Sequence, residues 1–321
     1  MQLLIGIDIG GTNIKLELMG KAARIKAKSI FPTDSFKGKN ALINEIARQT
    51  VRLLSEYSAT KRDLIGIWIG VPGAVDIRTG TVHYLTNIPG WREVPLGGIL
   101  RKRLKVPVFV DNDANVMALG EFKFGAGRGA KHMLCITLGT GVGGGLILNG
   151  SLYRGSDYAA GEFGHVPINI NGPKCNCGSW ACVEAYAGNH YIIKDTAAKI
   201  GRGEKTLIRK LVKGDLKKIT PEIIAEAARK GDRFARQIWV DIGNKVGIGL
   251  AGVVNLLNPE KIIIGGGVAG AGKILFDSIK KTVSARAMKL PAGTVKIVKA
   301  KLGCDAGIIG AATLALYELK R

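Results

Sequence analysis

The sequence predicts an α/β protein with two domains. Short apolar segments typical of strands alternate along the chain with longer amphipathic segments typical of helices. Glycine-rich turns follow three of the strand segments, at residues 10–13, 139–145 and 265–269. The chain has 321 residues, of which 46% are hydrophobic and 45 are glycine, so it is long enough for two hydrophobic cores connected by many loops.

The first predicted element is a hairpin with a glycine-rich turn. A buried strand at 3–9 runs through Asp8 into Gly10-Gly11-Thr12-Asn13, and a second strand follows at 14–19. The turn exposes backbone N–H groups, and its glycines let a phosphate come close to them. Asp8 could hold a magnesium ion against that phosphate. An ordinary tight hairpin explains the same residues, so the turn alone does not decide between the two.

Polar residues follow the next strands. The elements predicted here are, in order, a helix at 41–54, strands at 64–71 and 106–110, and a helix at 116–124. The strand at 64–71 ends in the turn Gly70-Val-Pro-Gly73, and ligands of open α/β sheets bind at such strand ends. The segment Asp111-Asn112-Asp113-Ala-Asn115 lies between the later strand and helix. A helix N-cap accounts for one of these polar residues but not for three.

The hairpin of the first domain has a second copy. A strand at 133–138, the glycines of 139–145 and a strand at 146–148 repeat the pattern, which indicates an internal duplication. Two such turns facing each other across a cleft could hold one polyphosphate. The remaining elements predicted are helices at 184–200, 221–229, 234–257, 272–288 and 306–319, and strands at 261–264 and 294–298. The basic segment 201–220 is expected to be exposed.

Cysteine and histidine gather between residues 161 and 184. His165, Cys175, Cys177 and Cys182 supply three thiolates and one imidazole, a complete tetrahedral ligand set for zinc that leaves no position for water. This favours a structural zinc ion over the alternative of a disulfide with incidental neighbours. A metal that fixes this loop also fixes the flanking carboxylates Glu162 and Glu184, which suit a hydroxyl-rich ligand unless they are ordinary surface acids.

The chain is strongly basic, with a net charge of +22. Lysine and arginine recur throughout rather than in one tract, and aromatic residues make up only 6% of the chain, so a base-stacking surface for nucleic acid is not expected. No signal-peptide pattern opens the sequence, and no uninterrupted apolar run reaches the ~18 residues of a membrane span. Three of the five cysteines are assigned to metal and Cys135 lies in an apolar strand, with Cys304 remaining, so we expect a cytoplasmic protein.

The motifs DxGGTN, GxPG, NDAN, GTGxGGG, ExGH, CxCGxxxCxE and a late GGG occur in the order in which the ROK sugar kinases carry them. The chain therefore resembles this family of bacterial-type glucokinases and N-acetylhexosamine kinases. The resemblance implies the actin-like ATPase fold, with two α/β domains and a cleft between them. It implies a small domain of residues 1–114 plus 304–321, and a large domain of residues 115–303 with the zinc loop. Ala181 departs from the pattern, because the family usually has glycine before the last cysteine.

The resemblance also implies site residues. Asp113 matches the catalytic base. The sugar-binding set is Gly73, Asn112, Asp113, Glu162, His165 and Glu184, with His165 serving zinc and sugar through its two ring nitrogens. The set for ATP and its Mg²⁺ is Asp8, Gly10, Gly11, Thr12, Asn13, Lys15, Gly139, Thr140, Gly141, Gly265, Gly266 and Gly267. Because the zinc loop carries two sugar ligands and no phosphate ligand, loss of zinc is expected to weaken sugar binding far more than nucleotide binding.

The implied function is ATP-dependent phosphorylation of the 6-hydroxyl of a hexose, with glucose preferred, by a homodimer or a dimer of dimers. N-acetylmannosamine or N-acetylglucosamine kinase activity is the alternative. Sugar-responsive repressors of the family carry a winged helix ahead of this domain, which needs roughly 60–80 residues. Here the first strand begins at Leu3, so we expect no specific nucleic-acid binding. A polyphosphate-dependent kinase is a further alternative, but family members with that donor generally lack the zinc loop.

Overall fold

The structure is a computed structural model that describes residues 2–11, 13–20, 25–36, 38–85, 88, 90–303 and 310. The chain divides into two compact units. Unit 1 comprises residues 1–129, 145–161 and 301–321, and unit 2 comprises residues 130–144 and 162–300. The expected helix at 306–319, apart from Gly310, and Cys304 lie outside the described residues. The domain bounds implied by the family resemblance stay a prediction.

Unit 1 is built on a five-stranded sheet with the order β3-β2-β1-β4-β8. Its strands are β1 (Leu3–Ile9), β2 (Asn13–Gly20), β3 (Ile25–Pro32), β4 (Leu64–Val71) and β8 (Val108–Asn112). The three N-terminal strands are antiparallel neighbours, whereas β4 runs parallel to both β1 and β8. Strands β1 and β4 are almost wholly buried, as their continuous apolar runs require. Strand β3 was not predicted, because alternating lysines make this edge strand resemble a surface loop.

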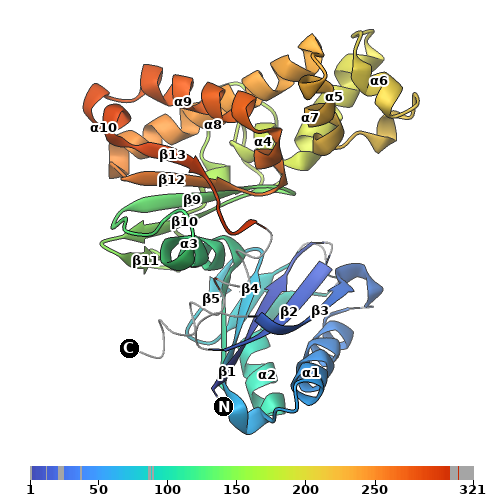
Figure 1. Ribbon diagram of the computed structural model, residues 1–321, viewed down its shortest axis with the longest axis vertical. Helices are drawn as coiled ribbons and strands as arrows, with labels where there is room; N and C mark the ends of the chain where they lie inside the picture. Colours follow the sequence, from blue (N-terminus) through green and yellow to red (C-terminus); the bar gives the residue numbers. More distant parts are fainter. Residues whose placement is uncertain are drawn as a thin grey trace. The chain divides into compact units, whose positions relative to one another are not determined.

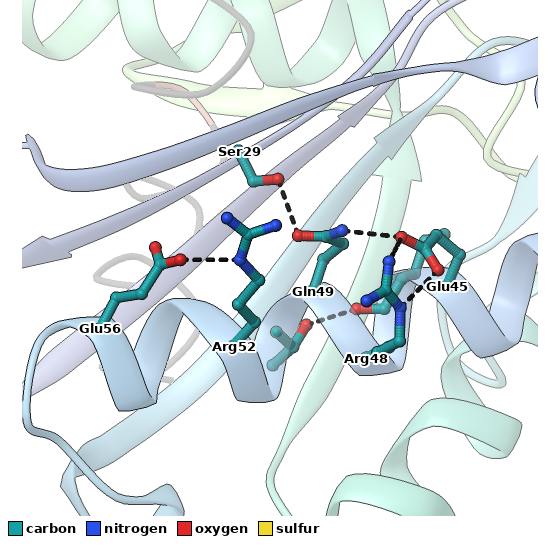
Figure 2. Close-up of polar contacts among 8 residues, drawn as sticks. Ser29, Glu45, Arg48, Gln49, Arg52 and Glu56 are labelled. Atoms are coloured by element: carbon teal, nitrogen blue, oxygen red, sulfur yellow. Dashed lines mark hydrogen bonds and ion pairs between the residues drawn. The ribbon is translucent and has the colours of Figure 1, made fainter.

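Helices α1 (Lys39–Glu56) and α2 (Leu96–Leu104) pack beside this sheet (Figure 1). A polar chain joins α1 to the edge strand (Figure 2). Ser29 donates a 2.9 Å hydrogen bond to the buried Gln49, which donates in turn to Glu45 at 2.7 Å. The remaining elements of the segment before β8 are the strands β5 (Val75–Asp76), β6 (Thr81–Tyr84) and β7 (Arg92–Val94) and the 3₁₀ turns Thr33–Ser35 and Lys61–Asp63. Helix α3 (Asp113–Phe124) follows β8 directly.

The second five-stranded sheet has the order β11-β10-β9-β12-β13. Its strands are β9 (Met133–Leu138), β10 (Val142–Leu148), β11 (Ser151–Tyr153), β12 (Lys261–Gly265) and β13 (Lys296–Lys299). Strand β12 lies parallel to β9 and β13. Cys135 is fully buried in β9, as expected from its apolar neighbours.

Unit 2 contains seven α-helices among the described residues. They are α4 (Glu184–Ala187), α5 (Asn189–Gly201), α6 (Leu207–Leu211), α7 (Pro221–Arg229), α8 (Arg233–Leu257), α9 (Lys273–Arg286) and α10 (Lys289–Thr294). Short 3₁₀ turns occur at Phe163–His165, Leu216–Lys218 and Gly267–Ala271. The helix predicted at 184–200 is divided at Gly188, whose backbone is extended.

The expectation that 201–220 is an exposed segment is wrong for its apolar side chains. Ile208, Val212 and Ile219 are buried, and α6 packs against α7. The basic residues of the segment are exposed, so a short amphipathic helix was hidden among them.

By length and composition alone, α8 is long and apolar enough to cross a membrane. The sequence showed no unbroken apolar run of this length, because charged residues interrupt the helix. Helices in the cores of globular domains often have this length and composition. Helix α8 packs closely along α9, with Gly243 against Ser278 and Gly247 against Thr282 (Figure 1). This packing accounts for the small residues on that face of α8.

Candidate functional site

The four predicted zinc ligands come together in unit 2. The ligand atoms of His165, Cys175, Cys177 and Cys182 all lie within 4.8 Å of one another. The Sγ atoms of Cys177 and Cys182 are 3.8 Å apart, as are Cys175 Sγ and His165 Nδ1. A disulfide would need about 2.05 Å, so the alternative of a disulfide is excluded for these cysteines. Sulfur atoms bound tetrahedrally at about 2.3 Å from one zinc ion lie roughly 3.8 Å apart, so the donor set fits zinc.

The loop backbone brings the cysteines together. The Cys175 N–H donates to Ser179 O at 2.8 Å and the Gly178 N–H donates to Cys175 O at 3.0 Å, which closes a tight turn around Cys177. Burial raises the pKa of Cys182 to about 12, and burial also raises the pKa of Cys175. Both thiols must therefore lose a firmly held proton to bind a metal, so zinc affinity will depend on pH.

Glu162 lies beside His165 in the same unit. Its Oε2 is 3.9 Å from His165 Nε2, while the other ring nitrogen, Nδ1, faces Cys175. The imidazole thus has one nitrogen toward the metal cluster and one toward a carboxylate, and its expected double role toward zinc and sugar stays a prediction. Partial burial raises the pKa of Glu162, and His165 opposes this shift.

Glu184, the first residue of α4, lies between the metal cluster and the glycine turn after β9. Its Oε2 accepts a 2.8 Å hydrogen bond from the Val142 N–H, and its Oε1 is 3.8 Å from Cys175 Sγ. The turn itself is closed by the Gly139 N–H, which donates to Gly141 O at 2.9 Å.

The other glycine turn of unit 2 lies beside this one. Strands β9 and β12 are paired so that Gly265 is opposite Thr137. Gly266 has a φ of 86°, and a Cβ atom there would lie 2.2 Å from Leu138 O, so only glycine fits. The two turns predicted to bind the nucleotide therefore lie side by side at the carboxyl ends of β9 and β12, within one unit.

Asn112 and Asp113 stand at the junction of β8 and α3 in unit 1. Asn112 is the N-cap of α3, and its side-chain oxygen accepts hydrogen bonds from the N–H groups of Ala114 (2.9 Å) and Asn115 (3.3 Å). Its Nδ2 donates to Gly73 O at 3.0 Å, which joins two predicted sugar-binding residues. The helix begins three residues earlier than predicted, because this cap supports it from Asp113 onward.

Asp8 occupies the end of β1, paired across the hairpin with Lys15. Burial raises the pKa of Asp8, and the positive charge of Lys15 opposes the shift. The Gly10 N–H donates to Asn13 O at 3.0 Å and closes the turn. Gly10, Gly11 and Gly73 line one pocket with Thr33 and Tyr84, two residues that the sequence did not single out. Thr12 lies outside the described residues.

The predicted site residues that the structure describes thus fall into two sets, one in each unit, and hydrogen bonds link several members of each set. The roles implied for them remain predictions. Sequence reasoning missed Arg154, which bonds to Asp111 beside the predicted base. No motif marks this arginine, so only the structure reveals its partner.

The ROK family model matches residues 4–318 of the chain. The glucokinase of Halalkalibacterium halodurans is 41% identical over 316 residues, which are 98% of this chain and 95% of that protein. A solved ROK family glucokinase from Streptomyces griseus, in complex with glucose and AMPPNP, has a TM-score of 0.85 and 34% identity, with 98% of this chain and 99% of that chain covered. A ROK family transcriptional regulator, a homologue of the E. coli MLC protein, has a TM-score of 0.89 and 26% identity, with 99% and 79% covered. The expected α/β class and actin-like ATPase fold are confirmed, and the chain belongs to the ROK family.

Proposed function

We propose that the protein is an ATP-dependent hexokinase that transfers the γ-phosphoryl group to the 6-hydroxyl of glucose. The proposal rests mainly on Asp113, a carboxylate at the N-terminus of α3 beside the Asn112–Gly73 hydrogen bond. The 41% identity to a glucokinase supports glucose as the sugar. The likeness to a protein solved with glucose and AMPPNP supports the pairing of a hexose with a nucleotide.

Each part of the reaction has residues of suitable chemistry. A sugar hydroxyl is a weak nucleophile, so Asp113 accepts its proton as the phosphoryl group arrives. Asn112, Glu162, His165 and Glu184 hold the other hydroxyls. Phosphoryl transfer depends mostly on positioning and on neutralising charge, which the backbone N–H groups of the glycine turns and Lys15 supply. Asp8 would hold Mg²⁺ at the phosphates.

The zinc ion has a structural role in this proposal. His165, Cys175, Cys177 and Cys182 would fill its coordination shell, so no position is left for substrate. The ion would fix the loop whose two ends carry Glu162 and Glu184. A homodimer and a cytoplasmic location remain predictions.

A sugar panel tests the proposal. With Mg²⁺ and ATP, a coupled assay compares kcat/KM for glucose, mannose, fructose, allose, N-acetylglucosamine and N-acetylmannosamine. We expect glucose to give the highest value, because sites built to bind hydroxyl groups reject sugars that lack a partner. An N-acetyl sugar tenfold better than glucose would reassign the substrate, and activity on none would refute the kinase. Replacing ATP by inorganic polyphosphate should abolish the reaction.

The regulator with a TM-score of 0.89 and the net charge of +22 make DNA binding the alternative to test. We expect only weak, sequence-independent binding that moderate salt abolishes, because scattered surface charge alone supports it. A salt-resistant and sequence-selective complex that responds to sugar would favour a regulator.

A further inference from the structure

The carboxylate of Glu184 lies directly against the glycine turn after β9. Its Oε2 accepts the Val142 N–H at 2.8 Å, and Val142 follows the turn residues Gly139, Thr140 and Gly141. A Cβ atom at Gly141 would lie 2.5 Å from the same Oε2, so a larger residue there would displace the carboxylate. The turn and the carboxylate are therefore fitted to each other.

The backbone after Glu184 supports the same turn. The Asn189 N–H donates to Gly139 O at 2.9 Å. A Cβ atom at Gly188 would lie 3.3 Å from Thr140 O, so the α4–α5 junction passes close to the turn. This junction is anchored by the Gly188 N–H, which donates to Glu184 O at 2.8 Å. Side chain and backbone of one short segment thus hold the turn at several points.

The same segment continues the metal loop. Glu184 follows Cys182 by two residues, and its Oε1 is 3.8 Å from Cys175 Sγ. The two oxygens of the carboxylate therefore face different neighbours, one the glycine turn and the other the metal loop.

We propose that Glu184 is a positioning residue for the phosphate-binding turn 139–141, in addition to its role as a sugar ligand. This inference rests on the function proposed above, which assigns ATP to that turn. The bond to Val142 orients the turn so that the Thr140 and Gly141 N–H groups face the phosphates. Sugar bound to Glu184 and nucleotide bound at the turn then share one residue, so each ligand should raise the affinity for the other. Loss of the metal loop should consequently weaken nucleotide binding too, contrary to our expectation from the sequence.

Nucleotide affinity measured without sugar tests this role. We expect Glu184→Ala to weaken the binding of Mg²⁺–AMPPNP by about tenfold or more, because a charge-assisted hydrogen bond to the turn is lost. Glu184→Gln keeps an oxygen that can accept the Val142 N–H, so its AMPPNP affinity should stay within about threefold of wild type. Both variants should bind glucose poorly. The contrast between alanine and glutamine separates positioning of the turn from loss of charge.

Glu162→Ala is the matched control, because Glu162 lies beside His165 and makes no hydrogen bond to the turn among the described residues. It should lose glucose affinity while binding AMPPNP normally. Zinc content must be one ion per chain in each variant. Unchanged AMPPNP affinity in Glu184→Ala, or an equal loss in Glu162→Ala, would overturn the proposal.

A second variant keeps Glu184 in place. Gly141→Ala should push the carboxylate off Val142 and lower AMPPNP affinity, with little further loss when combined with Glu184→Ala. Fully additive losses would contradict the proposed contact. Wild-type protein that binds AMPPNP in this pattern but phosphorylates no sugar would refute the proposed function and leave the role of Glu184 intact.

Discussion

Arg154 and Asp111 form a buried ion pair in unit 1. The guanidinium Nε and Nη2 atoms donate to Asp111 Oδ2 at 2.8 and 2.7 Å, and the two side chains are only 8% and 2% exposed. Asp111 Oδ1 accepts hydrogen bonds from the Asn112 N–H at 2.7 Å and from Asn115 Nδ2 at 3.0 Å. The pair therefore holds the strand-to-helix turn that carries Asp113.

Arg154→Met should destabilise the protein by about 3–5 kcal/mol, because it leaves the Asp111 carboxylate buried without this partner. We also expect kcat to fall by roughly tenfold to a hundredfold at a temperature where the variant is folded, since a small shift of the turn misplaces Asp113. Denaturant unfolding and steady-state kinetics measure the two effects.

The control for this variant is Arg52→Met on α1. Arg52 pairs with Glu56 at 2.7 Å (Figure 2), and both side chains are exposed, so the loss of this pair should change stability by no more than about 0.5 kcal/mol. The double variant Asp111→Asn/Arg154→Met should be less destabilised than the sum of the two single changes. Additive effects would show that the pair is not coupled.

Asp113→Asn should lower kcat by roughly 10²-fold or more, the usual contribution of a positioned general base. Asp113 Oδ1 accepts a 2.7 Å hydrogen bond from the Ala114 N–H, and the asparagine oxygen can accept the same bond. Stability and glucose affinity should therefore stay near wild type. Single-turnover kinetics and glucose titration check this. A variant that retains wild-type kcat would remove Asp113 from the role of base.

Most helices and strands of the two units could be predicted from the sequence, because they bury continuous or periodic apolar faces. Strand β4 and helix α7 have the bounds that the hydrophobic pattern predicted. Helix α2 and strand β3 were missed for the opposite reason: their buried residues are interrupted by glycine, lysine or arginine, so the periodicity is weak.

The part of the candidate site whose residues lie close together in the sequence could be predicted. The zinc ligands lie within one loop, and their residue types restrict the possible metal strongly. The bond from Val142 to Glu184 and the pair of Asp111 with Arg154 join residues 42 and 43 positions apart. Hydrophobic periodicity carries no information on such polar contacts, so they could come only from the structure.

Zinc should be present at one ion per chain, and Cys177→Ala should lose it, because three ligands remain. Removal of the metal should lower the apparent Tm and weaken glucose binding, since the loop positions Glu162 and Glu184. Elemental analysis and thermal unfolding measure these outcomes. Asn176→Ala changes an exposed neighbour outside the ligand set and should retain zinc. Freshly purified protein without zinc would contradict the assignment.

Asp8→Asn should stabilise the protein at neutral pH while abolishing Mg²⁺-dependent activity. Burial raises the pKa of Asp8, so the folded state holds this proton more tightly than the unfolded chain. The resulting stability is present below the unfolded pKa of about 3.9 and is lost as pH rises through the higher folded value. Asparagine mimics the protonated form and removes that loss. Unfolding free energies measured at acid and neutral pH test this prediction.

Asp63→Asn supplies a control of opposite sign. The Thr60 N–H donates to Asp63 Oδ2 at 2.9 Å and lowers the pKa of Asp63. Its contribution to stability is therefore present above the unfolded pKa and is lost as pH falls, so Asp63→Asn should lower stability at neutral pH. Equal responses of the two variants would contradict this account.

Ala181 has a φ of 57°, in the left-handed region that favours glycine. A non-glycine residue in this conformation costs about 1–2 kcal/mol of backbone strain, whereas burial of the Ala181 methyl group stabilises the fold by about 0.8 kcal/mol. Ala181→Gly should therefore be as stable as wild type or more stable by up to about 1 kcal/mol, with zinc retained. Ala181→Val should be destabilised by more than about 2 kcal/mol, because a branched side chain adds strain in this backbone conformation. It would also be crowded, since the Ala181 methyl packs so closely on Gly172 that a Cβ atom at Gly172 would lie only 2.6 Å from it. Ala227→Gly, in the regular helix α7, should instead lose about 1 kcal/mol. Thermal unfolding of the three variants with zinc bound decides the matter, and a destabilised Ala181→Gly variant would show that the methyl contact outweighs the backbone strain.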